Sequence, residues 1–115
     1  MLWPVLPRRL YQDLSVQSLN VALTRICNVN CVFCPYQFAE KDEKMHMEDE
    51  VFERVIEGIE ETGIKSVMLA PDLGEPFLAP GFMDKVRRMR RAGVRLIQVT
   101  TNATVLHRVG IEEIV

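Results

Sequence analysis

Three cysteines within eight residues are the part of the sequence that most clearly indicates chemistry. Cys27, Cys31 and Cys34 form a C-x3-C-x2-C arrangement. An odd, clustered set cannot form a disulfide framework, so the spacing favours metal binding. Three thiolates on one loop can each bind a different iron of a cubane cluster, whereas electron-transfer clusters normally take four cysteines. The fourth iron then keeps an open position, which is typical of a catalytic metal centre.

A structural zinc site built from the three cysteines and His46 is the main alternative. Structural zinc sites usually contain paired C-x2-C spacings, and only Cys31 and Cys34 have that spacing here. We interpret His46 and His107 as ordinary loop or surface residues. A non-catalytic iron–sulfur or zinc-binding module therefore stays open beside the enzymatic interpretation.

The elements that must position the cysteines alternate between strands and helices. Residues 1–17 are predicted to be an irregular lead-in, and a long loop over 25–47 holds all the cysteines. Alternation and helical periodicity predict three strands and two helices, with a third helix starting near 109: strands 19–24, 66–70 and 95–100, and helices 48–62 and 82–93. This order predicts an α/β fold with a parallel sheet and right-handed crossover helices.

Three polar or glycine-containing segments each follow a predicted strand. They are residues 27–34, 73–76 and 101–102. Functional groups of parallel sheets gather at the carboxyl ends of the strands, so we expect the three segments to meet at one edge.

Residues 27–34, Cys-Asn-Val-Asn-Cys-Val-Phe-Cys, resemble the signature of radical S-adenosylmethionine (radical SAM) enzymes, including the aromatic Phe33 before the last cysteine. Residues 73–76, Leu-Gly-Glu-Pro, are similar to the G-G-E-P turn of that family. Residues 101–103, Thr-Asn-Ala, are similar to its T-N-G segment. The resemblance extends over residues 19–106, and in each of the last two motifs one family glycine is replaced, by leucine and by alanine.

The resemblance implies a role for each motif. The three cysteines would ligate a [4Fe-4S] cluster whose open iron binds the amino and carboxylate groups of S-adenosylmethionine: Cys27, Cys31 and Cys34. Gly74 and Glu75 would lie beside the methionine amino group, Phe33 would line the adenine, and Asn102 would contact cofactor or substrate. Plainer alternatives are a simple turn for Gly74 and Glu75, a turn or cap for Asn102, and core packing for Phe33.

The implied reaction is electron transfer from the reduced cluster into S-adenosylmethionine. This gives methionine and a 5′-deoxyadenosyl radical, which takes a hydrogen atom from a peptide or small-molecule substrate. The implied electron donor is a protein such as flavodoxin or ferredoxin. The Cys34-Pro35-Tyr36 run and the Gly-Glu-Pro-Phe turn resemble the SPASM-type branch, whose members often carry extra clusters in a C-terminal extension.

The fold implied for residues 18–115 is the N-terminal half of a partial (β/α)6 TIM-like barrel. The chain supplies about three strand–helix units and ends inside a predicted helix, so we expect an incomplete domain. An inactive truncation is a further alternative.

The composition is that of an ordinary globular domain, with 48% hydrophobic and 26% charged residues and a formal net charge of −2. This charge does not favour nucleic acid or an anionic membrane as partner. The N-terminus has its basic pair after the apolar residues, the reverse of a signal peptide, so we expect a cytoplasmic protein.

Overall fold

The computed structural model describes residues 18–69, 72–110 and 112. Within these residues it has three strands and two α-helices, with short 3-10 helices in the loops: β1 (Ser18–Val21), α2 (Asp49–Thr62), β2 (Ser66–Leu69), α3 (Phe82–Arg91) and β3 (Leu96–Val99). The predicted α/β class and element order are confirmed. The predicted lead-in and strand residue Ala70 lie outside the described residues, as does most of the predicted third helix.

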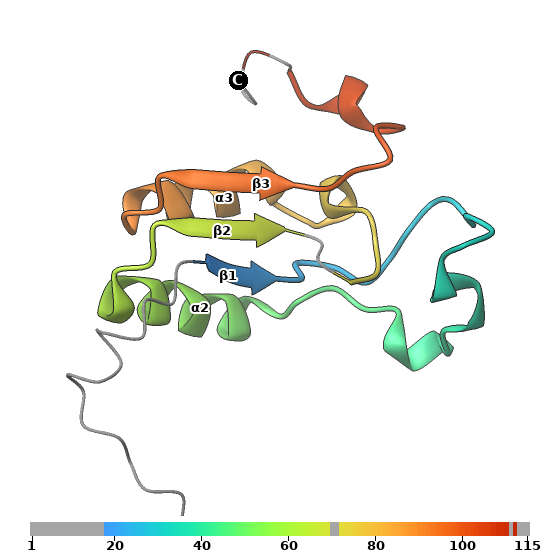
Figure 1. Ribbon diagram of the computed structural model, residues 1–115, viewed down its shortest axis with the longest axis horizontal. Helices are drawn as coiled ribbons and strands as arrows, with labels where there is room; N and C mark the ends of the chain where they lie inside the picture. The colour runs from blue at the N-terminus through green and yellow to red at the C-terminus, as the bar shows by residue number, and fades with distance from the viewer. Residues whose placement is uncertain (1–17, 70–71, 111, 113–115) are drawn as a thin grey trace, which may run out of the picture.

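The strands form one parallel sheet in the order β1-β2-β3 (Figure 1). Ser66 of β2 lies opposite Ser18 on one side and opposite Leu96 on the other. Parallel neighbours need a crossover, and α2 and α3 supply the two crossovers. All three arrowheads in Figure 1 therefore point the same way, and the loops that follow the strands lie beyond them.

The core lies between the sheet and the two helices. Val67 and Leu69 of β2 are fully buried, as are Ile59 of α2 and Met89 of α3. Burying an aliphatic side chain of this size contributes roughly 1.5–3 kcal/mol. On the other face of the sheet, side chains of the outer strands are exposed: Ser18, Asn20, Leu96 and Gln98.

Helix α2 buries Phe52, Ile56 and Ile59, which share one face at helical spacing. Val51 precedes Phe52 in this helix and is 46% exposed, so it does not belong to the buried face. One residue corresponds to about 100° of helix rotation, which places Val51 at the margin of the face that Phe52 defines. Gly63 ends the helix with a φ of 70°, as a left-handed C-terminal cap.

Strand β1 ends at Val21 rather than at the predicted Thr24. From Leu23 onward the backbone pairs instead with the far end of the loop that holds the cysteines (residues 25–47, the cysteine loop). There, Met47 N donates to Leu23 O at 2.9 Å. The predicted loop of 25–47 is present and contains two 3-10 helices, Pro35–Phe38 and Lys41–Glu43. Among the described residues, no helix combines the length and the apolar character needed to cross a bilayer.

Candidate functional site

The cysteine loop is closed at its base by a short antiparallel contact. Thr24 and His46 form an isolated bridge, and Arg25 N donates to Met45 O at 2.8 Å. The Thr24 side chain is 2% exposed and its Oγ1 accepts from Ile26 N at 3.0 Å. The cysteines therefore lie on a loop whose two ends are fastened together next to β1.

His46 belongs to this base. Its Nδ1 lies 2.8 Å from Thr24 Oγ1. Within residues 18–69, 72–110 and 112, no three His, Cys, Asp or Glu side chains are grouped so that they could hold a metal ion. A zinc site needs all its ligands around one ion, whereas each thiolate of a cubane cluster binds a different iron. In the described part of the chain, the side-chain partner of His46 is Thr24 and not a cysteine.

Tyr36 organises the interior of the cysteine loop. Its ring is 8% exposed, and its hydroxyl donates to Cys27 O at 3.1 Å. The Lys44 ammonium lies 4.5 Å from the centre of that ring. Cys34 N donates to Cys31 O at 3.0 Å, which forms a turn between the last two cysteines. Tyr36 thus ties the first cysteine to the segment after the third, a role that its position in the sequence did not reveal.

The three cysteines are free thiols of intermediate exposure. Three unpaired thiols on one closed loop fit the donor set of a cluster held by three thiolates. Phe33 is 87% exposed, so the alternative that it packs in the core is wrong. Its contact with an adenine ring stays a prediction.

Gly74 lies where the loop after β2 touches the start of the cysteine loop. Its φ is 103°, and a Cβ atom there would lie 2.5 Å from Thr24 O. Glu75 N donates to Ile26 O at 2.8 Å. The glycine is therefore required by the close approach of two backbone segments of this chain.

The Glu75 side chain is 1% exposed and accepts three hydrogen bonds. Its Oε1 accepts from Phe77 N at 3.2 Å and from Thr101 Oγ1 at 2.7 Å. Its Oε2 accepts from Asn102 N at 2.8 Å. The bond from Phe77 is that of an N-terminal cap, so the plainer interpretation as a turn residue is right in part. The other two bonds fasten the loop after β2 to the loop after β3.

Asn102 connects the loop after β3 to the cysteine loop. Its Nδ2 donates to Asn28 Oδ1 at 3.1 Å and to Cys27 Sγ at 3.8 Å. Its Oδ1 accepts from Thr104 N at 3.0 Å and from Thr104 Oγ1 at 2.7 Å. The three segments predicted to meet at one edge are thus joined by hydrogen bonds. Sequence reasoning missed Asn28 and Thr104, which carry no signal apart from their nearness to the motifs.

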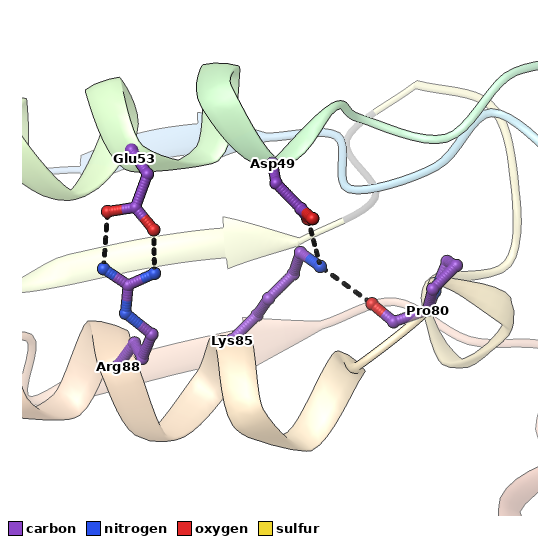
Figure 2. A network of polar contacts seen from close by, with 5 residues as sticks. All are labelled: Asp49, Glu53, Pro80, Lys85 and Arg88. Atoms are coloured by element: carbon purple, nitrogen blue, oxygen red, sulfur yellow. Dashed lines mark hydrogen bonds and ion pairs between the residues drawn. The ribbon is translucent and has the colours of Figure 1, made fainter.

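A second polar network links α2 to α3 on the outside of the sheet (Figure 2). Arg88 donates from both terminal nitrogens to the two carboxylate oxygens of Glu53. Lys85 Nζ donates to Pro80 O at 2.8 Å and lies 3.6 Å from Asp49 Oδ1. The hydrogen bond and positive charge of Arg88 hold the pKa of Glu53 below its ordinary value. Cations and carboxylates pair with each other here, which indicates a helix–helix contact.

Comparison with known proteins places these motifs in a family. The model of the Radical SAM superfamily matches residues 21–115. The probable GTP 3′,8-cyclase of Pyrococcus abyssi is 34% identical over 97 residues, which cover 84% of this chain and 30% of the relative. That of Sulfurisphaera tokodaii is 32% identical over 92 residues, which cover 80% of this chain and 28% of the relative. The chain thus spans less than a third of the length of these relatives.

A solved structure has the same fold. The crystal structure of BtrN in complex with AdoMet and 2-DOIA matches with a TM-score of 0.67 at 19% sequence identity, covering 75% of this chain and 35% of that chain. This likeness supports the predicted fold, the N-terminal part of a TIM-like barrel. The match of the family model over residues 21–115 shows that the chain belongs to the radical SAM superfamily, a family of enzymes that use a [4Fe-4S] cluster and S-adenosylmethionine.

Proposed function

We propose that this chain forms the cofactor-binding part of a radical SAM enzyme that acts on a small molecule. The three thiolates of the cysteine loop ligate the cluster and leave one iron for S-adenosylmethionine: Cys27, Cys31 and Cys34. The observation that carries this proposal is the junction at the carboxyl edge. There, Glu75 and Asn102 join three loops that are far apart in the sequence.

The cluster, when bound, supplies the electron that cleaves S-adenosylmethionine to methionine and a 5′-deoxyadenosyl radical, which takes a hydrogen atom from the substrate. The chain holds and orients the groups that take part. The Glu75 carboxylate already accepts three hydrogen bonds and is 1% exposed. We therefore assign contact with the methionine amino group to the backbone of Gly74 and Glu75. Phe33, exposed beside the last cysteine, is available to lie against the adenine.

The substrate belongs to the proposal as well. The relatives are probable GTP 3′,8-cyclases, so a purine nucleoside triphosphate is the first substrate to test, and a small molecule is favoured over a peptide. A flavodoxin or ferredoxin as electron donor and a cytoplasmic location complete the proposal. Membership of the SPASM-type branch stays a prediction from the Cys34-Pro35-Tyr36 run.

Product analysis tests the proposal. The protein is reconstituted with iron and sulfide without oxygen, reduced with dithionite and incubated with S-adenosylmethionine in the absence of substrate, so that buffer components supply the hydrogen atom that converts the radical to 5′-deoxyadenosine. We expect 5′-deoxyadenosine and methionine in equal amounts from the wild type and none from Cys31→Ala, because a cubane held by two thiolates is not retained. An iron-loaded wild type that leaves S-adenosylmethionine intact would contradict the proposal.

His46→Gln is the matched control. The zinc alternative makes His46 a ligand, so it predicts that this variant loses its metal. The proposed cluster needs only the three cysteines, so we expect His46→Gln to retain iron and to form 5′-deoxyadenosine.

A further inference from the structure

The contacts of Asn102 point to a role on the cluster itself. We propose that the Asn102 side chain donates an N–H···S hydrogen bond to Cys27 Sγ and thereby raises the reduction potential of the cluster. Nδ2 and Sγ are 3.8 Å apart. This inference rests on the proposed function, and it replaces contact with cofactor or substrate as the role of Asn102.

The orientation of the Asn102 amide follows from its partners. Thr104 N is a backbone donor 3.0 Å from one end of the amide, and only the carbonyl oxygen can accept from it. The NH2 group must therefore point the other way. Its two hydrogens face two acceptors, Asn28 Oδ1 at 3.1 Å and Cys27 Sγ at 3.8 Å. A flipped amide would turn its oxygen toward the sulfur and its nitrogen toward a donor.

A closed ring of hydrogen bonds holds this orientation. Asn28 Nδ2 donates to Thr104 Oγ1 at 2.8 Å, and Thr104 Oγ1 donates to Asn102 Oδ1 at 2.7 Å. Asn102 Nδ2 then donates back to Asn28. The backbone of Asn102 is fixed separately, by its N–H bond to the buried Glu75 carboxylate. The donor is thus held in place from two sides, and Glu75 acts as a positioning residue.

The electrostatic consequence has a definite sign. Reduction adds one negative charge to the cluster, and part of that charge lies on the thiolate sulfurs. A donor aimed at one of these sulfurs stabilises the reduced state more than the oxidised state, so it raises the potential. Removal of the donor makes the cluster harder to reduce.

An anaerobic redox titration followed by the electron paramagnetic resonance signal of the reduced cluster tests the inference. For Asn102→Ala we expect the ratio of reduced to oxidised cluster at a fixed potential to fall about tenfold, which is ~59 mV for a one-electron couple. Asn102→Asp keeps the oxygen that faces Thr104 but replaces the donor with an anionic oxygen, so its potential falls further. Asn30→Ala is the control, because this exposed amide lies in the same loop and has no hydrogen bond to a cysteine among the described residues, and its potential stays near that of the wild type.

The iron content of each protein shows whether the proposed function or only this inference has failed. A wild type that takes up no iron overturns both the proposed function and this inference. The second possible result is a wild type that holds about four irons and cleaves S-adenosylmethionine. If Asn102→Ala then has the same iron content and the same reduction potential as this wild type, the inference alone is overturned. If Asn102→Ala loses its cluster, the same redox titration is carried out on Thr104→Val. This variant opens the ring at the Thr104 hydroxyl without altering residue 102 and leaves the bond from Thr104 N to the amide oxygen in place. We therefore expect a smaller fall in the same direction, whereas no fall contradicts the inference.

Discussion

Two polar networks join distant parts of this chain, one around Glu75 at the carboxyl edge of the sheet and one around Glu53 between the helices. Each is centred on a glutamate that accepts several hydrogen bonds. The Glu75 residue is 1% exposed, whereas the Glu53 side chain is 52% exposed. The partners of Glu75 are backbone N–H groups and a hydroxyl, and the partner of Glu53 is a guanidinium.

This difference in burial decides what each network does. A buried donor that loses its acceptor pays the full cost of its desolvation, whereas an exposed ion pair that is lost is replaced by water and salt. The Glu75 network therefore fixes the position of the loops that carry the candidate site. The Glu53 network adds little to stability and can vary without moving those loops.

The largest effect is expected at Gly74. In Gly74→Ala the new Cβ would lie 2.5 Å from Thr24 O on a backbone with a φ of 103°. Strain and overpacking together should lower the free energy of unfolding by about 3 kcal/mol or more, measured by urea denaturation. Gly63→Ala is the control, since its φ is 70° but nothing lies within 4 Å of the new Cβ. If Gly74→Ala and Gly63→Ala lowered the free energy of unfolding equally, residue 74 would not lie as close to Thr24 O as the structure places it.

The second-largest effect is expected when each of the two glutamates is replaced by glutamine. Glu75→Gln turns an amide NH2 toward a buried donor, so the free energy of unfolding should fall by about 2 kcal/mol. Glu53→Gln removes a charge from an exposed pair, and we expect a much smaller loss in the same urea measurement. If Glu53→Gln proved the more damaging variant, burial would not be what separates the networks.

A smaller effect, an increase in the free energy of unfolding, is expected when Ala103 is replaced. Its φ is 65°, a left-handed conformation that is unfavourable for alanine. In Ala103→Gly the relief of this strain exceeds the entropy cost of glycine, so stability should rise by roughly 0.5–1 kcal/mol. The melting temperature would increase and iron uptake would be unchanged. A lower melting temperature would mean that the loop after β3 relaxes away from this conformation.

The smallest effect is the pH dependence of the Glu53 pair. Arg88 lowers the pKa of Glu53 from its ordinary value of 4.5. A carboxyl group with a lowered folded-state pKa contributes stability above its unfolded-state pKa and loses it as the pH falls through the folded-state pKa. The small difference between wild type and Glu53→Gln should therefore vanish in acid below the ordinary value, and salt should reduce it at neutral pH. If the difference in stability between the wild type and Glu53→Gln grew on acidification, the pKa of Glu53 would not be lowered in the folded state.

The sequence predicted the elements and the three motifs, because strand and helix periodicity and cysteine spacing are local signals. It predicted that the motifs would meet, because parallel strands bring their carboxyl ends to one edge. It could not predict which atoms meet there. The ring of Asn28, Asn102 and Thr104 depends on how two loops approach each other, and the bond from Tyr36 to Cys27 depends on how a long loop folds on itself.

Glu75 illustrates the same limit. A carboxylate in a Gly-Glu-Pro turn suggested a partner for a cationic amine, and the structure shows that its donors come from within the chain. The identity of the residue was informative, but its partners are set by the tertiary structure.

Metal analysis after oxygen-free reconstitution examines the assignment on which the other proposals rest. We predict about four irons and four sulfides per chain, with a broad absorbance near 400 nm that changes when S-adenosylmethionine is added. One zinc per chain and no iron, or a cluster spectrum that S-adenosylmethionine leaves unaltered, would contradict the assignment.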